Sequence, residues 1–174
     1  DGLIWFATES DGLFSYDEKG IINYDSKDGL TGVDISTIFE ASNGDIWFGT
    51  WDRGGAIKYD GNNFLTTSVE DGLIGNGIVS SFSQDSSSHI LIGTGGPTSG
   101  IQIYDDSSQQ GKFLDTYTPR LMGSTFWGVG VNSILGVPNG IFWMGTWEDG
   151  LIKFENGFFR RYTRNSHGLI DDRV

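Results

Sequence analysis

Few side chains in this sequence are suited to acid–base or nucleophilic chemistry. The 174 residues include two histidines, His89 and His167, and no cysteine. Without cysteine the chain has no thiolate nucleophile, no disulfide and no cysteine-ligated zinc. We expect His89 in a turn between two strands and His167 in a loop between two repeats. These positions fall at opposite rims of the expected fold, so a shared histidine site is not predicted.

Carboxylates that recur along the chain are the second group of candidates. They are Asp17, Asp60, Asp105 and Glu155, which follow four similar stretches. Because a repeated residue usually serves a repeated structure, we expect these carboxylates to accept hydrogen bonds in turns. Oxygen-rich loops at residues 60–63 and 105–108 could ligate calcium, but neither has the spacing of an EF-hand. We therefore predict no catalytic residue, no metal site and no cofactor.

Neither glycine content nor charge points to phosphate or nucleic-acid binding. The stretch GTGGPTSG at residues 93–100 lacks the Lys-Ser/Thr and the helix of a phosphate-binding loop. The formal charge of −12 repels polyanions and anionic membrane surfaces, but leaves neutral or cationic ligands open. The sequence therefore predicts no nucleic-acid partner and no membrane contact by this segment.

Aromatic residues beside charged residues are the strongest candidates for binding. The predicted ligand-binding residues are Trp51, Asp52, Arg53, Trp147, Glu148, Arg120 and Trp127. Trp51 and Trp147 follow a Gly-Thr pair in only two of the repeats, so the repeated fold itself does not require them. Arg120 and Trp127 belong to an irregular insertion at residues 117–130, and long loops of this kind often serve function. Aromatic rings stack on sugars while charged groups bond hydroxyls, which favours carbohydrate.

The elements that position these residues repeat along the chain. The similar stretches are LIWFATESDGLFSYD, DIWFGTWDRGGAIKYD, HILIGTGGPTSGIQIYD and IFWMGTWEDGLIKFE, at intervals of 42, 44 and 52 residues. Such intervals are typical of β-propeller blades. The 27 glycines and 14% aromatic residues also suit short strands joined by tight turns.

The most regular repeat predicts four antiparallel strands separated by turns. The predicted strands are Val33–Ala41, Asp45–Trp51, Ala56–Asp60 and Asn63–Val69. The second strand is apolar on both faces, which is expected when sheets stack on both sides. Trp5, Trp47 and Trp143 share one position in this strand and are predicted to be core. The fold class is all-β, a portion of a β-propeller with four-stranded antiparallel blades around a central axis.

The chain divides into about four blades that form a single propeller segment over residues 1–174. The expected boundaries are 1–27, 28–70, 71–118, 119–166 and 167–174. The first unit lacks its inner strand and the last begins a further blade. These ends favour a portion of a larger ring over a closed ring of four blades.

The phrase DGLTGVDISTIFEASNGDIWFGT closely resembles the two-component regulator propeller repeat. Its continuation is matched by DGLFSYD, GGAIKYD, SGIQIYD and DGLIKFE. The resemblance implies a non-enzymatic, periplasmic or extracellular sensor propeller, associated with a histidine kinase and responding to oligosaccharide. It also implies contacts with neighbouring propeller blades or a homodimer. Two alternatives remain: a propeller lyase similar to the streptogramin-B lyases, which needs a catalytic histidine beside metal-binding carboxylates, and a protein-interaction scaffold.

Overall fold

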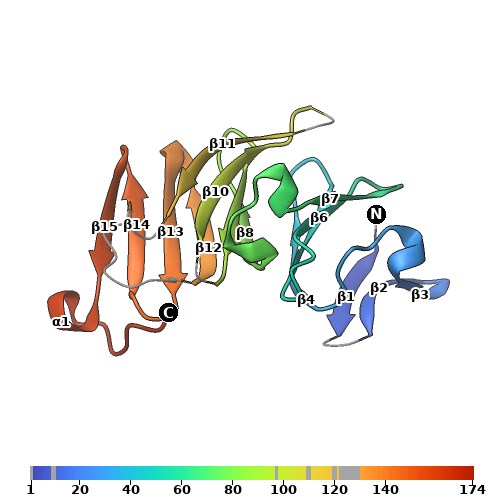
Figure 1. Ribbon diagram of the computed structural model, residues 1–174, viewed down its shortest axis with the longest axis horizontal. Helices are drawn as coiled ribbons and strands as arrows, with labels where there is room; N and C mark the ends of the chain where they lie inside the picture. The colour runs from blue at the N-terminus through green and yellow to red at the C-terminus, as the bar shows by residue number, and fades with distance from the viewer. Residues whose placement is uncertain (1, 9–10, 97, 109–110, 119–120, 122–129) are drawn as a thin grey trace.

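The computed structural model describes residues 2–8, 11–96, 98–108, 111–118, 121 and 130–174. Within these residues the fold is almost entirely β-structure, arranged as four antiparallel sheets (Figure 1). Each sheet is a meander in which strands adjacent in the sequence pair with one another. The all-β propeller architecture predicted from the sequence is confirmed.

The sheets follow one another in chain order. The first sheet contains β1 (Ile4–Thr8), β2 (Gly12–Asp17) and β3 (Gly20–Tyr24). The second contains β4 (Ile35–Glu40), β5 (Ile46–Thr50), β6 (Ala56–Tyr59) and β7 (Phe64–Thr67). The third contains β8 (Val79–Gln84), β9 (Ile90–Thr94), β10 (Gly100–Asp105) and β11 (Lys112–Tyr117). The fourth contains β12 (Val131–Val137), β13 (Ile141–Thr146), β14 (Leu151–Glu155) and β15 (Phe158–Tyr162).

Short helical turns connect the sheets. They are η1 (Ser26–Asp28), η2 (Val69–Asp71), η3 (Gly75–Gly77), η4 (Pro138–Gly140) and α1 (Arg164–His167). The four strands of the second sheet lie within the ranges predicted from the sequence. In the described residues the first sheet has three strands and begins with the counterpart of β5, so it lacks an inner strand. None of the helices in the described part is long and apolar enough to cross a membrane.

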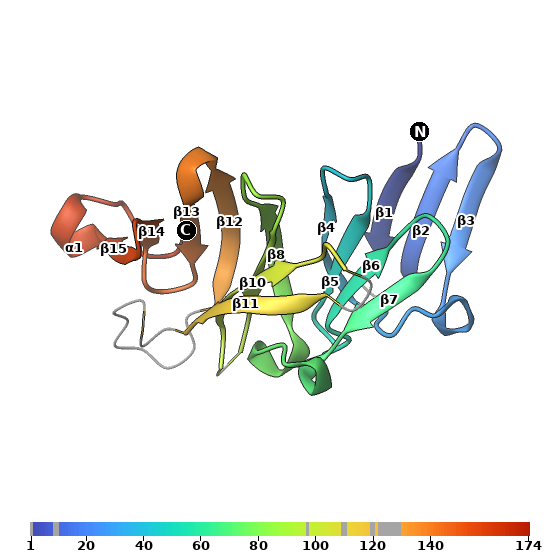
Figure 2. The ribbon, with the colours of Figure 1, turned by 90° about the horizontal axis from the view of Figure 1, so that it is seen from above.

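The sheets stack face to face as an open series along the long axis of the molecule (Figure 2). Their inner strands meet through one repeated side-chain bond. The Ser36 hydroxyl donates to the carbonyl of Val79, the Ser80 hydroxyl donates to the carbonyl of Val131, and the Asn132 amide donates to the carbonyl of Val174 at 3.2 Å. Val174 therefore lies against the fourth sheet as Val79 lies against the second.

Close approach at the inner strands depends on glycine. A Cβ on Gly49 would lie 2.7 Å from the carbonyl oxygen of Val79. A Cβ on Gly145 would lie 2.8 Å from the carbonyl oxygen of Val174. Both contacts are too short for a real side chain, so glycine is required where the backbone of Val79 and of Val174 passes.

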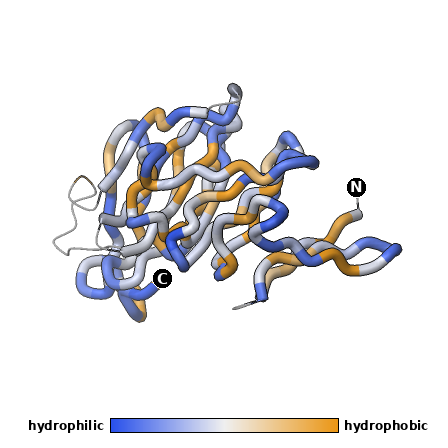
Figure 3. Tube along the Cα trace, turned by 45° about the vertical axis from the view of Figure 1, so that its right-hand side comes forward, coloured by the Kyte–Doolittle hydropathy of each residue, from blue (hydrophilic) through white to orange (hydrophobic). Residues whose placement is uncertain are grey.

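Three hydrophobic clusters fill the spaces between successive sheets. Leu13, Leu30, Phe48 and Ile57 form the cluster between the first and second sheets. Residues of the second and third sheets, including Trp47, Phe82, Ile90 and Tyr104, form the next. Leu91, Ile101, Phe142, Met144 and Ile152 join the third and fourth sheets. Figure 3 shows the apolar stretches along the strands and the hydrophilic turns between them.

The repeated tryptophan occupies different surroundings in different sheets. Trp47 is 1% exposed and belongs to the core, as predicted. Trp5 is partly buried and packs between Tyr24, Phe48 and Tyr59. Trp143 is also partly buried, but it lies on the outer face of the fourth sheet, and among the described residues no fifth sheet covers it. Within its own sheet, Trp143 packs against the ring of Tyr162 and the ammonium of Lys153.

The threonine of the Gly-Thr motif forms a side-chain hydrogen bond in every four-stranded sheet. The sequence analysis did not predict this bond. Thr50, Thr94 and Thr146 are fully buried at the ends of β5, β9 and β13. Their hydroxyls donate to the carbonyls of Gly55, Gly100 and Gly150 at 3.2, 3.3 and 2.7 Å, respectively. The threonine thus closes the loop between the second and third strands of each sheet.

Candidate ligand-binding site

The loops that follow these threonines carry most of the predicted ligand-binding residues. Trp51 begins the β5–β6 loop and Trp147 begins the equivalent β13–β14 loop. Both loops therefore emerge at the same rim of the propeller. The side chain of Trp51 is 42% exposed and that of Trp147 is 50% exposed. Two large aromatic surfaces are thus available to solvent at equivalent positions of two sheets.

Each tryptophan ring lies beside a glycine of a neighbouring segment. A Cβ on Gly95 would lie 3.8 Å from Cζ3 of Trp51, so this ring borders the third sheet. A Cβ on Gly130 would lie 2.7 Å from Cδ1 of Trp147. The backbone of Trp147 also donates to the carbonyl of Gly130 at 3.2 Å. A side chain at residue 130 would therefore collide with the Trp147 ring, whereas one at residue 95 would make an ordinary contact with Trp51.

Asp52 has a structural task within its loop. Its carboxylate accepts hydrogen bonds from the backbone of Val33 at 2.9 Å and of Asp34 at 3.5 Å. It also accepts one from Gly54 at 3.3 Å. These bonds tie the β5–β6 loop to the segment that precedes β4. Asp52 therefore helps to fix the loop that carries Trp51. Its carboxylate oxygens have fewer lone pairs left for a ligand.

Arg53 lies in the same loop with an exposed side chain and a left-handed backbone, φ 69°. Its carbonyl lies against Gly77 of the next loop, where a Cβ would be only 2.8 Å away. The backbone of Gly55 donates to the carbonyl of Gly77 at 3.1 Å. The guanidinium thus projects from a backbone that is anchored to the neighbouring sheet.

The β13–β14 loop adds one charged residue that sequence reasoning missed. Glu148 is exposed, as predicted for a ligand-binding residue, whereas the next residue, Asp149, is 3% exposed. The Arg161 guanidinium donates to the Asp149 carboxylate at 2.8 Å. The sequence does not indicate which of the adjacent acids, Glu148 or Asp149, is buried, because the partner of Asp149 is Arg161 on β15. Arg120 and Trp127, also predicted to bind ligand, lie outside the described residues.

A cleft between the second and third sheets was not predicted from the sequence. This cleft has a volume of about 470 Å³ and is lined by residues that include Trp47, Lys58, Asp71, Tyr104, Asp106 and Phe113. Its volume falls in the range of small-molecule sites, about 300–1,000 Å³. The sequence feature that could have indicated this cleft is Lys58 in the otherwise apolar β6, which pairs with the buried Trp47.

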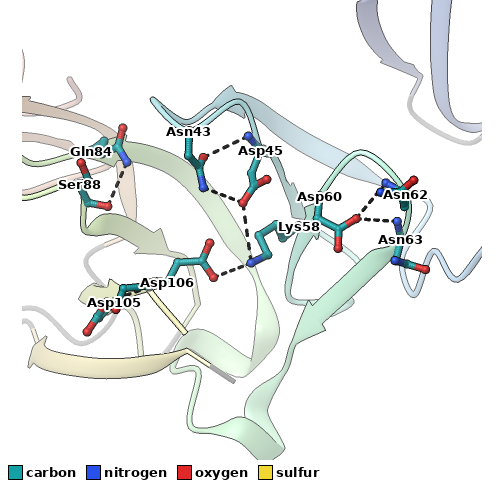
Figure 4. A network of polar contacts seen from close by, with 11 residues as sticks. Asn43, Asp45, Lys58, Asp60, Asn62, Asn63, Gln84, Ser88, Asp105 and Asp106 are labelled. Carbon is teal, nitrogen blue, oxygen red and sulfur yellow. Dashed lines mark hydrogen bonds and ion pairs between the residues drawn. The ribbon is translucent and has the colours of Figure 1, made fainter. Parts of the chain in front are cut away.

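A buried ion pair crosses this cleft (Figure 4). The Lys58 ammonium donates to the Asp106 carboxylate at 2.6 Å and lies 3.9 Å from the Asp45 carboxylate. The side chains of Lys58 and Asp106 are 12% and 10% exposed. Burial raises the pKa of Asp106, and the nearby lysine opposes this shift. The pair therefore links two sheets in a region where carboxylate charge is costly.

The recurring carboxylates act as turn acceptors in three sheets, as predicted. Asp17, Asp60 and Asp105 accept backbone hydrogen bonds from Lys19, Asn62 and Ser107 at 2.8, 2.9 and 3.0 Å. A bond from the Asn63 backbone is the largest cause that lowers the pKa of Asp60, and the Ser107 side chain lowers that of Asp105. Glu155 differs, because it accepts from the Lys153 ammonium at 2.7 Å.

The histidines lie in unrelated surroundings. His89 Nδ1 is 3.0 Å from Oδ2 of Asp85, four residues earlier in the chain. His167 Nδ1 is 2.7 Å from the Ser166 hydroxyl, and its ring packs 4.8 Å from that of Tyr162. Among the described residues, no three histidine, aspartate or glutamate side chains gather closely enough to hold a metal ion.

Comparison with solved structures identifies the fold. The extracellular domain of BT4673 from B. thetaiotaomicron, named as a one component system, superimposes with a TM-score of 0.76 at 21% identity, covering 99% of this chain and 23% of its own. The extracellular domain of BT3049 from the same organism, named as a hybrid two component system, gives 0.60 at 19% identity, covering 95% and 27%. Virginiamycin B lyase from Staphylococcus aureus gives 0.66 at 14% identity, covering 92% and 52%.

This chain therefore spans about a quarter of the two extracellular domains and about half of the lyase. At these identities the likeness shows a shared fold. The chain has no significant match to a curated protein. At the level of sequence families, residues 29–52, which include β4 and β5, match the two component regulator propeller. The resemblance inferred from the sequence is thus confirmed: this β-propeller chain carries a two component regulator propeller repeat.

Proposed function

We propose that the chain is a non-enzymatic ligand-sensing module from the periplasmic or extracellular region of a two-component signalling protein. The single observation that carries the proposal is the family match at residues 29–52. The likeness to extracellular domains named as one and two component systems supports it. The module would report ligand binding to an output region such as a histidine kinase.

The proposed ligand is a neutral oligosaccharide at the rim that carries Trp51 and Trp147. Their exposed rings provide flat apolar surfaces for sugar stacking, and Arg53 and Glu148 supply a charged donor and acceptor nearby. The formal charge of −12 disfavours sulfated or otherwise anionic chains. Arg120 and Trp127 remain proposed contributors to this site.

Calorimetric titration of the purified chain with neutral and with sulfated oligosaccharides tests this function. We expect binding of a neutral oligosaccharide, weakened at least about fivefold by Trp51→Ala or Trp147→Ala, since one lost stacking contact costs about 1 kcal/mol or more. Phe158→Ala removes an aromatic ring that is 78% exposed away from these loops, so it is the matched control. Binding that survives both tryptophan substitutions would remove the rim from the proposal.

The lyase alternative rests on the likeness to virginiamycin B lyase. Such chemistry would need a histidine beside metal-binding carboxylates, and the described surroundings of His89 and His167 do not provide this arrangement. The interaction-scaffold alternative would be favoured if the rim bound protein and none of the oligosaccharides. These observations support binding over catalysis as the proposed role.

A further inference from the structure

The last residue of the last strand is a tyrosine in three of the four described sheets. These tyrosines are Tyr24, Tyr117 and Tyr162, whereas the second sheet ends with Thr67. The four residues are equivalent by register, because each pairs with the first apolar residue of the preceding strand. These partners are Leu13, Ile101, Leu151 and Ala56, respectively. Thr67 therefore stands where the other sheets carry a large ring.

At the contact between the first and second sheets, the Tyr24 ring packs into the space between the two sheets. Its ring centre lies 5.3 Å from the centres of both Trp5 and Phe64. It also lies 6.3 Å from the centre of the Tyr59 ring. The Tyr24 hydroxyl is 3.1 Å from the Ser15 hydroxyl, so the polar end of the ring has a partner within its own sheet.

The contact between the third and fourth sheets repeats this arrangement. The Tyr117 ring centre lies 5.2 Å from those of Phe154 and Phe159, which are cross-strand partners. Tyr59 and Phe64 are likewise cross-strand partners. At both contacts, therefore, a tyrosine from one sheet packs on an aromatic pair of the next sheet.

Between the second and third sheets the aromatic pair is present and the tyrosine is replaced. Tyr104 and Phe113 are cross-strand partners whose ring centres lie 5.1 Å apart. Both rings and Thr67 line the cleft of about 470 Å³. The cleft therefore lies where a tyrosine ring packs at the other two contacts, and the short threonine side chain is the reason that it is open.

The polar end of the cleft also has a counterpart at the contact between the first and second sheets. Lys58 corresponds to Ser15, because each pairs with the repeated tryptophan of its own sheet. Ser15 is the partner of the Tyr24 hydroxyl, so Lys58 lies where the hydroxyl of an equivalent ring would be received. The Lys58 ammonium donates to the Asp106 carboxylate at 2.6 Å. A hydroxyl at this point would meet both a donor and an acceptor.

Charge at this polar end favours a neutral ligand. The Lys58 ammonium is 2.6 Å from the Asp106 carboxylate and 3.9 Å from that of Asp45. Asp71 and Lys112, the other charged residues that line the cleft, are of opposite sign. A bound carboxylate would add a third negative charge beside Asp45 and Asp106, and a bound ammonium would lie beside Lys58. A neutral hydroxyl avoids both repulsions.

We propose that the cleft binds a small neutral phenol whose ring takes the place of the missing tyrosine ring. The ring packs on Tyr104 and Phe113, as the tyrosines do on the aromatic pairs of the other two contacts. The phenol hydroxyl accepts a hydrogen bond from Lys58 and donates one to Asp106. A volume of about 470 Å³ leaves room for substituents on the ring. This site is in addition to the oligosaccharide site proposed at the rim.

Fluorine NMR titration of the purified chain with para-fluorophenol tests the site. We expect a saturable broadening of the fluorine signal as the compound binds. Fluorobenzene, which lacks the hydroxyl, and para-fluorobenzoate, which adds a negative charge, should each bind at least about tenfold more weakly. Equal binding of the three compounds would overturn the proposal, and so would the absence of saturable binding by the phenol.

Substitutions of Thr67 test where the phenol binds. Thr67→Tyr restores the repeated ring, so it should weaken binding of para-fluorophenol at least about tenfold. The same variant should have a higher melting temperature, because the added ring fills the cleft. Thr67→Val keeps the size of threonine and leaves the cleft open, so it is the matched control and should bind within about twofold of the unmodified chain.

Nuclear Overhauser contacts locate the ligand in the unmodified chain, so the test does not depend on the folding of a variant. We expect contacts from the ring protons of para-fluorophenol to the rings of Tyr104 and Phe113. Circular dichroism establishes that the Thr67 variants are folded. Contacts to other parts of the chain alone would overturn the proposal, as would unchanged binding by a folded Thr67→Tyr variant.

Discussion

Buried threonine hydroxyls join strand to loop at equivalent positions of three sheets. In the fourth sheet, the hydroxyl of Thr146 donates to the carbonyl of Gly150 and accepts from the backbone of Asp149 at 3.0 Å. Because Thr146 is fully buried, water cannot replace either bond. This single side chain therefore holds the backbone of the loop that begins with Trp147.

Replacing Thr146 with valine keeps the shape of the side chain and removes both hydrogen bonds. We expect the free energy of unfolding to fall by about 1–3 kcal/mol, because two buried backbone groups lose a partner. Urea denaturation measures the loss. Thr146→Ser retains the hydroxyl and should recover part of the difference. Equal stability of the valine variant and the unmodified chain would show that the hydroxyl contributes nothing.

Individual residues differed in how well the sequence could predict them. The turn carboxylates Asp17, Asp60 and Asp105 were predictable, because each partner lies within three residues and the position recurs. The Lys58–Asp106 ion pair was not, since its partners are 48 residues apart and meet only when two sheets stack. The binding roles proposed for Trp51 and Trp147 stay predictions, although the exposure of both rings agrees with them.

The loop between β13 and β14 requires a glycine for its backbone conformation. Gly150 has φ 77°, and a Cβ there would overlap the carbonyl oxygen of Tyr162 on β15. Gly140 has a similar φ of 70°, but a Cβ there would have no atom within 4 Å. An alanine at residue 140 would therefore have only the cost of a left-handed backbone. An alanine at residue 150 would have that cost and a steric clash as well.

Gly140→Ala should reduce the free energy of unfolding by about 1–2 kcal/mol, the usual cost of a left-handed alanine. Gly150→Ala should cost more, because β14 and β15 must also separate to admit the methyl group. Thermal and chemical denaturation of both variants test the difference. The steric argument fails if the two substitutions are equally destabilising.

Strand order was predictable because apolar runs, turns and the blade interval recur together. β5 was identified by its two apolar faces, and Phe48 and Trp47 do enter different clusters. The sequence did not reveal that Trp143 is more exposed than Trp47, because the two residues share one sequence motif. Burial here depends on the neighbouring sheet more than on the residue itself.

On the scale of the whole molecule, the described sheets form a linear series whose main packing contacts join neighbouring sheets. The first sheet is held on one face, and β1 has one unpaired edge in the described structure. The second and third sheets are held on both faces. Stability in such arrays is close to a sum of units and nearest-neighbour contacts.

Hydrogen exchange should therefore be uneven along the chain. At concentrations below any self-association, amides of β1–β3 should exchange faster than those of β5 and β9, because the first sheet can separate without opening the others. Mass spectrometry of peptides from each sheet measures this gradient. Uniform protection across all sheets would instead indicate a single cooperative unit.

The glycines beside the inner strands have a geometric consequence. Gly49 and Gly93 let the inner strands of successive sheets approach closely at Val79 and Val131, while Trp47 and Lys58 fill the wider space farther out, beside the cleft. Each pair of sheets is therefore a wedge, narrow at one end and wide at the other. The angle of that wedge fixes the curvature of the series and, with it, how many sheets complete a full turn.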